Sequence, residues 1–108
     1  MSVQDKIQSQ VDQNDIILYM KGTPELPMCG FSSYVSQLLN FLKVDYASVN
    51  VLDDMEIREG IKTFSNWPTI PQLYVKGEFV GGCDILKEMY EQGELKPFLS
   101  EKGVLAEA

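Results

Sequence analysis

Histidine is absent from the 108-residue sequence, and cysteine is rare, with only Cys29 and Cys83 present. Without histidine, zinc sites built from cysteine and histidine and catalysis by an imidazole base are excluded. Two cysteines are too few for the disulfide framework of a small secreted protein, so they indicate a reducing compartment and a functional thiol. The sequence also lacks an apolar stretch of the roughly 20 residues that a membrane-spanning helix needs.

Basic residues are scarce as well: 9 lysines and arginines stand against 16 aspartates and glutamates, which gives a formal net charge of −7. This acidity argues against nucleic acid and anionic membranes as partners, because both require a basic surface. The N-terminus shows neither a basic segment followed by an apolar one nor an arginine-rich leader, so we expect a cytoplasmic protein. The start at Met1 favours a bacterial cytosol over an organelle.

The length and the ordinary composition, 44% hydrophobic and 23% charged residues, predict a single globular domain spanning residues 1–108. A chain of this size buries roughly two thirds of the surface that its unfolded form exposes. We therefore expect no metal or disulfide to be needed for folding. The last residues, 103–108, are predicted to form a frayed tail.

Hydrophobic periodicity predicts that helices alternate with strands. Apolar runs and alternating apolar residues predict strands at 16–20, 46–52, 72–75 and 78–80. Spacings of three and four residues predict a helix at 3–13 that follows a capping box at Ser2-Val3-Gln4-Asp5, and a second helix from the loop after the first strand to about Lys43. Further helices are predicted after an Asp53-Asp54 cap, from an Asp84 cap to Gly93, and briefly around 95–99. The first two strands are joined through a helix and are therefore parallel, whereas the last two form a hairpin. We predict an α/β fold with a four-stranded mixed sheet flanked by helices on both faces.

Cys29 is the residue around which the predicted chemistry is organised. It follows the strand at 16–20 and a loop, and it precedes a segment with helical spacing. Free N–H groups and the positive end of the helix dipole favour a thiolate at such a place. Comparable sites lower a cysteine pKa from about 8.5 to roughly 3.5–7.5. The alternative is a small buried hydrophobic residue, as most lone cysteines are, but the turn residues and nearby Lys21 favour the reactive thiol.

Ser32 stands where a Cys-x-x-Cys motif between a strand and a helix, the redox signature of thioredoxin-like proteins, has its second cysteine. A serine cannot resolve a mixed disulfide. Cys29 would therefore need Cys83 or an external small thiol such as glutathione to complete an exchange cycle.

Four separated segments resemble the monothiol glutaredoxins of the CGFS type. They are Lys21, Cys29-Gly30-Phe31-Ser32, Trp67-Pro68-Thr69-Ile70-Pro71-Gln72 and Gly81-Gly82-Cys83-Asp84. The segments occur in the family's order, with its long loop between Lys21 and Cys29, and the likeness covers about residues 5–100. No motif position departs from the family pattern. The resemblance implies a thioredoxin fold that binds glutathione and, as a homodimer, carries a [2Fe-2S] cluster.

The cluster that the resemblance implies takes four thiolates, and one chain offers only Cys29 in a suitable place. Two chains and two glutathione molecules together supply four. Ser32 agrees with this arrangement, because no neighbouring thiol competes with the cluster by forming a disulfide with Cys29.

The resemblance also assigns residues to glutathione. It places Lys21 and Arg58 at the glycyl carboxylate, although taken alone Arg58 would be a solvated surface residue. It pairs the backbone of Ile70 with the cysteinyl part, beside a cis bond at Pro71. The sequence by itself would predict trans there, since cis accounts for only roughly 5–6% of X-Pro bonds in folded proteins.

The helix that opens at Cys83-Asp84 presents free N–H groups to the γ-glutamyl carboxylate, and the Asp84 side chain can meet the ammonium group. Asp84 can at the same time be a simple helix cap. Cys83 has three open roles: a structural thiol, a bystander lining the peptide site, or an oxidation partner of Cys29. We expect Gly81-Gly82 to permit a close backbone approach, and Trp67 to lie in the core rather than in contact with a ligand.

The first functional hypothesis is an iron–sulfur carrier that stores and transfers a [2Fe-2S] cluster held by Cys29, with a role in iron homeostasis. The alternative is a glutathione-dependent thiol-disulfide oxidoreductase in which Cys29 removes glutathione from mixed disulfides, an activity that the resemblance implies to be weak. A third hypothesis is an adaptor for BolA-type proteins, which the family binds, alongside apo iron–sulfur clients. The acidic surface offers no positive support for this adaptor role.

Overall fold

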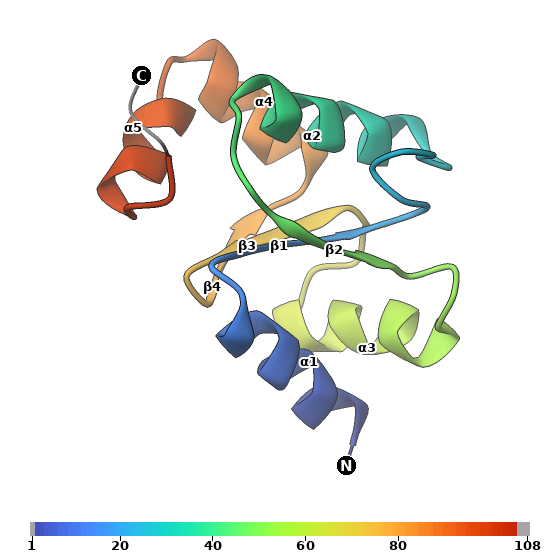
Figure 1. Cartoon of the computed structure of the whole chain (residues 1–108). Helices are drawn as coiled ribbons and strands as arrows, with labels where there is room; N and C mark the ends of the chain where they lie inside the picture. The colour runs from blue at the N-terminus through green and yellow to red at the C-terminus, as the bar shows by residue number, and fades with distance from the viewer. Residues whose placement is uncertain (1, 106–108) are drawn as a thin grey trace.

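The computed structural model describes residues 2–105, and its centre is a four-stranded sheet in the order β2-β1-β3-β4 (Figure 1). The strands are β1 (Ile16–Met20), β2 (Ala47–Asn50), β3 (Gln72–Val75) and β4 (Glu78–Gly81). β1 pairs in parallel with β2 and antiparallel with β3, and β3 pairs antiparallel with β4. The predicted mixed sheet, with a parallel pair followed by a hairpin, is confirmed.

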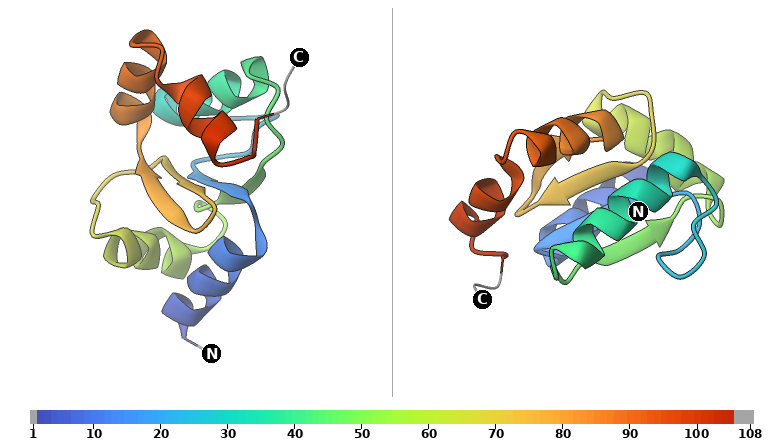
Figure 2. Two further views of the ribbon diagram at one scale, coloured as in Figure 1. Left: turned by 90° about the vertical axis from the view of Figure 1, so that its left-hand side faces the viewer. Right: turned by 90° about the horizontal axis from the view of Figure 1, so that it is seen from above.

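Helices cover both faces of this sheet, as the sequence predicts. One face is covered by α1 (Val3–Gln13) and α3 (Met55–Ser65). The other face is covered by α2 (Gly30–Phe41), α4 (Cys83–Glu91) and α5 (Leu95–Glu101). Figure 2 shows α2 and α4 lying on the same face, with α5 beyond them near the end of the chain. None of the helices described is long and apolar enough to cross a membrane.

β1 lies between the two helical layers, and all five of its residues are buried. Its side chains alternate between two hydrophobic clusters, because successive residues of a strand face opposite sides of the sheet. Ile16, Leu18 and Met20 belong to the cluster beneath α2, α4 and α5. Ile17 and Tyr19 belong to the cluster above α1 and α3. A run without polar alternation thus forms a strand that is covered on both sides.

Two of the predicted helix caps are present. The Ser2 hydroxyl accepts a hydrogen bond from the N–H of Asp5 at 3.1 Å, and α1 begins there. Asp54 starts α3, because its Oδ1 accepts from the N–H groups of Glu56 and Ile57 at 3.0 and 3.2 Å. Both satisfy N–H groups that a helix leaves without internal partners.

The predicted Asp84 cap is wrong. Gly82 is the N-cap of α4, the helix begins at Cys83, and no side chain caps it. Asp84 instead lies in the first turn, where its negative charge faces the positive end of the helix dipole. A buried glycine occupies the cap position because Gly82 packs closely against the backbone of Pro71, 3.0 Å from the place that a Cβ would take.

The predicted frayed tail is also wrong where the structure describes it. Val104 and Leu105 pack against the cluster beneath α2, α4 and α5. Gly103 has φ +74°, and the N–H of Val104 donates to the carbonyl of Leu99 at 3.1 Å, which ends α5 in a Schellman motif. The remainder of the predicted tail, 106–108, lies outside the described residues.

Candidate functional site

The loop that connects β1 to α2 brings Cys29 to the start of α2. It is folded back on itself, since the N–H of Met28 donates to the carbonyl of Lys21 at 2.9 Å. Gly22 is required at the base of the loop, because its φ is +92° and a Cβ there would lie 2.5 Å from the carbonyl oxygen of Leu26. The long loop between Lys21 and Cys29 therefore has a defined shape.

Cys29 is the N-cap residue of α2, with extended backbone, and it is partly buried. Burial opposes ionisation of its thiol. The backbone N–H groups of Ser32 and Phe31, the Ser32 hydroxyl and the Lys21 ammonium outweigh burial and hold the pKa of Cys29 below its ordinary value. The pKa shift has the predicted direction, and its main favourable cause is the N–H groups of the first helical turn, which favour the thiolate.

Ser32 has a role that the sequence did not reveal. It is fully buried, and its hydroxyl accepts a hydrogen bond from the backbone N–H of Lys21 at 3.0 Å. The same hydroxyl stabilises the Cys29 thiolate. Ser32 is therefore more than a missing second cysteine, because it joins the end of β1 to the thiol.

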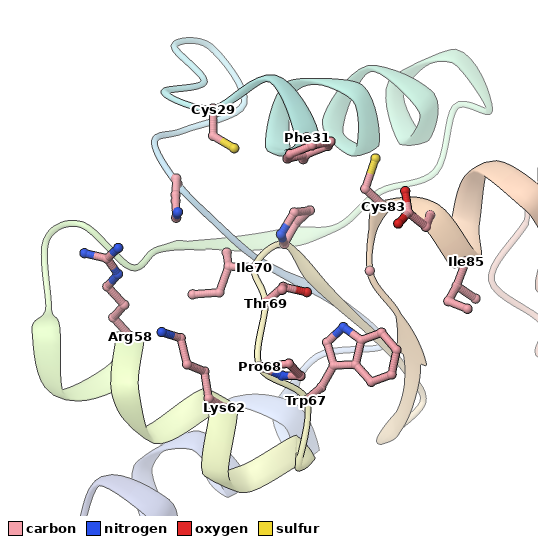
Figure 3. A pocket seen from close by; sticks show the side chains of 14 residues that line it. Cys29, Phe31, Arg58, Lys62, Trp67, Pro68, Thr69, Ile70, Cys83 and Ile85 are labelled. Atoms are coloured by element: carbon pink, nitrogen blue, oxygen red, sulfur yellow. The ribbon is translucent and has the colours of Figure 1, made fainter.

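A cavity of about 710 Å³ opens beside Cys29 (Figure 3). All of the site residues predicted from the sequence line it: Lys21, Cys29, Arg58, Ile70, Cys83 and Asp84. The lining also includes residues that the sequence analysis did not assign to the site, namely Phe31, Lys62, Pro68, Thr69 and Ile85. The structure thus brings together side chains from four separate parts of the chain.

One wall of the cavity is positively charged. Neither Lys21 nor Arg58 takes part in the ion pairs found within residues 2–105, although the chain has many carboxylates. Figure 3 shows Arg58 and Lys62 extending from α3 toward the cavity. Lys62 is paired with Glu59 at 3.2 Å. The sequence feature that could have predicted Lys62 as a site residue is its position four residues after Arg58, which places both side chains on one face of a helix.

The opposite end of the cavity is formed by the start of α4. Its first N–H groups have no partners within the helix and can bind an anion. Gly82 permits the close approach expected of Gly81-Gly82, because a Cβ on Gly82 would lie 3.0 Å from the carbonyl of Pro71 and 3.5 Å from Nε1 of Trp67. Asp84 is exposed beside these N–H groups.

Between the two ends, the segment before β3 forms the floor of the cavity. The Ile70–Pro71 bond is cis, as the family resemblance implies. Gln72 is fully buried, and its Nε2 donates to the carbonyls of Trp67 and Thr69, both at 3.0 Å. Gln72 therefore fixes the conformation of the segment that precedes it, which its position in a predicted strand did not suggest.

The prediction that Trp67 lies in the core is wrong. Its side chain is 37% exposed and lines the cavity, with its ring centroid 5.9 Å from that of Phe79. The core beneath Trp67 is filled by the buried ring of Tyr74, which packs against both Phe64 and Phe79. Trp67 is left at the rim of the cavity.

Cys83 is a free thiol that lines the cavity and packs against the core. Burial and the Asp84 carboxylate raise its pKa, Cys29 adds to the increase, and Lys87 partly opposes it. Figure 3 shows Phe31 between the two cysteines in this view. The lining and packing positions are observed, whereas oxidation to a disulfide with Cys29 stays a prediction.

The part of the chain that the structure describes contains no group of three or more cysteine, aspartate or glutamate side chains able to hold a metal ion. One chain alone therefore offers no four-thiolate cluster site there. Cys29 lines the cavity, and its neighbours Met28 and Phe31 are 61% and 62% exposed.

Comparison with known proteins identifies the family. The glutaredoxin family model matches residues 16–80. Glutaredoxin-related protein 5, mitochondrial, from Danio rerio is 54% identical over 94% of this chain, which spans only 66% of that protein. Probable monothiol glutaredoxin 2 of Rickettsia typhi is 52% identical over 89% of this chain and 86% of its own length. Glutaredoxin 4 of Haemophilus influenzae is 50% identical over 94% of both.

Solved structures agree with the sequence comparison. A monomeric truncated mutant of Trypanosoma brucei 1-C-Grx1 has a TM-score of 0.88 at 40% identity, covering 100% of this chain and 98% of that one. Buckwheat glutaredoxin, solved as a complex with glutathione, has a TM-score of 0.84 at 26% identity, covering 96% and 93%. With its thioredoxin-like sheet and a single cysteine at the start of α2, this chain belongs to the glutaredoxin family, as a member of the monothiol type.

Proposed function

We propose that this protein binds glutathione in the cavity beside Cys29 and that two copies of it carry a [2Fe-2S] cluster as cargo for apo-proteins. The observation that carries the proposal is a thiol of lowered pKa in a cavity that also holds two cations, Lys21 and Arg58, which form no ion pair within residues 2–105. A thiolate beside an anion-binding pocket suits a small acidic thiol as partner.

Glutathione has two carboxylates and one ammonium group, and the cavity offers matching groups at both ends. Lys21 and Arg58 suit the glycyl carboxylate, and Lys62 adds a third positive charge to the same wall. The N–H groups at the start of α4 suit the γ-glutamyl carboxylate, with Asp84 beside them for the ammonium. The backbone of Ile70 and the Cys83 segment line the space between. Buckwheat glutaredoxin, solved as a complex with glutathione, supports glutathione as the ligand.

The cluster assignment rests on the resemblance to the monothiol glutaredoxins, and the number of thiols in the chain agrees with it. Each chain has a single thiol of lowered pKa, Cys29, and the described residues contain no metal-binding cluster. A [2Fe-2S] cluster takes four thiolate ligands, and two chains supply them when each contributes Cys29 and one bound glutathione. Such a cluster serves as the transferable iron–sulfur unit, and a role in storage, transfer and iron homeostasis would follow.

Anaerobic reconstitution with iron, sulfide and glutathione tests this proposal. We expect a coloured dimer from the native chain and from Cys83→Ser, and a colourless monomer from Cys29→Ser. Leaving out glutathione should also prevent assembly. A Cys29→Ser protein that holds the cluster as well as the native chain would show that the thiolate has been assigned wrongly.

A second function is favoured by the same lowered pKa of Cys29. The thiolate attacks the glutathione sulfur of a protein–glutathione disulfide, which forms a Cys29–glutathione disulfide and releases the protein thiolate. A second glutathione thiolate then attacks that disulfide, which yields glutathione disulfide and restores Cys29. Ser32 cannot replace this second glutathione, so the reaction depends on glutathione concentration.

Steady-state turnover of a glutathionylated peptide separates the two functions. High turnover by the cluster-free chain would favour the oxidoreductase, and slow turnover together with efficient cluster transfer would favour the carrier. BolA-type proteins and apo iron–sulfur clients are included in the proposal as partners. If a pull-down with the cluster-loaded dimer retains neither a BolA-type protein nor an apo iron–sulfur client, these partners are excluded from the proposal.

A further inference from the structure

Two successive backbone N–H groups after β1 are held by side chains from two other elements. The N–H of Lys21 donates to the Ser32 hydroxyl of α2 at 3.0 Å. The N–H of Gly22 donates to Oδ1 of Asn50 at 2.9 Å. Gly22 is buried, so its N–H group has little access to water and needs a partner within the protein.

Asn50 is the last residue of β2 and is paired with Met20 at the end of β1. Its Oδ1 accepts a second hydrogen bond, from the N–H of Leu52 at 3.0 Å. One carbonyl oxygen therefore ties together two segments. The first begins with Lys21, and the second is the turn that leads into α3, which carries Arg58.

Lys21 and Arg58, two of the cations of the cavity wall, thus project from segments that meet at a single side chain. Asn50 itself does not line the cavity. Asn50 can affect a ligand only through the two backbone groups that it holds, the N–H of Gly22, next to Lys21, and the N–H of Leu52, in the turn before the helix that carries Arg58. A carboxylate is bound best when both cations reach it at once, because charge-assisted hydrogen bonds depend on geometry.

We propose that Asn50 is a positioning residue that sets the separation of Lys21 and Arg58 and thereby the affinity of the cavity for the terminal carboxylate of a γ-glutamyl peptide. This inference rests on the proposed binding of glutathione. A leucine at position 50 has a similar volume but no acceptor, and it leaves the buried Gly22 N–H without a partner. An aspartate keeps the acceptor.

The test uses the full chain and two probes that cannot exchange disulfides: S-methylglutathione and its glycinamide analogue, which lacks the terminal carboxylate. Calorimetry gives each Kd. We expect Asn50→Leu to weaken S-methylglutathione binding about tenfold, the size of one lost charge-assisted contact, and to leave the amide unchanged. Asn50→Asp should bind S-methylglutathione more tightly than Asn50→Leu. Asn40→Leu, an exposed asparagine of α2, should bind like the native chain.

A double-mutant cycle separates positioning from general stability. If Asn50 acts through Lys21, the Lys21→Gln/Asn50→Leu double variant should lose much less than the product of the two single losses. Urea unfolding of Asn50→Leu should show a single cooperative transition, which demonstrates that the variant is folded.

Two kinds of result contradict the proposals, and they differ. Native protein that binds neither probe at millimolar concentration overturns the proposed function, and this inference with it. Native protein that prefers S-methylglutathione to the amide, combined with an Asn50→Leu variant that binds both probes normally or loses both equally, overturns only the positioning role.

Discussion

Cys29 and Cys83 occupy similar places, yet their thiols respond to those places in opposite ways. Both lie at the start of a helix, both are partly buried, and both line the same cavity. Burial raises the pKa of Cys29, but the N–H groups of Ser32 and Phe31 outweigh burial and lower it. The pKa of Cys83 is raised, first by burial and then by Asp84.

The difference shows that a helix N-terminus does not by itself favour a thiolate. Cys29 is the N-cap residue, and the N–H groups two and three residues later, those of Phe31 and Ser32, favour its thiolate. Cys83 is the first helical residue, after the Gly82 cap, and no backbone N–H group lowers its pKa. The nearest charges add to the contrast, because Lys21 accompanies Cys29 and Asp84 follows Cys83.

The largest expected effect is a difference in alkylation rate. Cys83→Ala leaves only Cys29 to react with iodoacetamide, and Cys29→Ala leaves only Cys83. At pH 7 we expect Cys29 to react at least about tenfold faster, since each unit of pKa below the ordinary range changes the thiolate fraction about tenfold. The ratio should shrink as the pH rises and both thiols ionise. Rate profiles with the same midpoint for both cysteines would contradict the comparison.

The loop that delivers Cys29 has no counterpart at Cys83, and two glycines test its importance. Gly22→Ala places a methyl group 2.5 Å from the carbonyl of Leu26, at φ +92°. Gly77→Ala has the same kind of strain, φ +81°, in open space. We expect Gly77→Ala to lower the free energy of unfolding by about 1 kcal/mol and Gly22→Ala by about 2 kcal/mol or more.

The Gly22→Ala variant should also slow the alkylation of Cys29 while that of Cys83 stays unchanged. Urea unfolding and the alkylation assay measure both effects on the same protein. Equal stability losses in the two alanine variants would mean that backbone strain alone, and not the packing of the loop, decides the outcome.

Much of the fold could be predicted because its signals are local. The unbroken apolar run of β1 and the caps at Ser2 and Asp54 each depend on residues close in the sequence, and all were confirmed. Cys29 was predicted from its place between a strand and a helix, whereas the ligand roles of Lys21 and Arg58 and the cis bond at Pro71 came from the family resemblance, and the structure brings all of them to one cavity.

The missed features depend on contacts between distant segments. The Gly22–Asn50 hydrogen bond joins residues 28 positions apart, and no periodicity indicates it. Trp67 lies at the rim, where its ring packs against Phe79, and Phe79 in turn packs against the buried ring of Tyr74. Asp84 is a common capping residue, but the close approach of Gly82 to Pro71 moves the cap two residues earlier.

A smaller effect is expected from removing one hydroxyl near Cys29. Ser32→Ala removes the side-chain bond to the Cys29 thiolate and the acceptor of the Lys21 N–H. We expect the pKa of Cys29 to rise and its alkylation at pH 7 to slow by about threefold to tenfold, as for one lost hydrogen bond. Ser33→Ala is the matched control, because its hydroxyl accepts from Gln37 at 2.8 Å on the exposed side. Equal alkylation rates of Cys29 in both variants would show that the Ser32 hydroxyl does not stabilise the thiolate.

The smallest expected effect is on stability as a function of pH, and its sign differs between the two cysteines. The unfolded chain has thiols that titrate near about 8.5. With Cys29 alone, in Cys83→Ala, the folded pKa is lower, so the unfolded state binds more protons below about 8.5. The stabilisation is present above that pH and is lost as the pH falls through the folded pKa.

With Cys83 alone, in Cys29→Ala, the folded pKa is higher, so the stabilisation is full below about 8.5 and is lost as the pH rises through the folded value. Urea unfolding between pH 6 and 10 measures both slopes after subtraction of the double alanine variant, which removes the contribution of groups shared by all three proteins. Tyr74, whose pKa burial raises to about 12, titrates above this range. Opposite slopes would mean that one cavity holds a thiolate and a thiol side by side, whereas equal slopes would mean that the two helix starts are electrostatically equivalent.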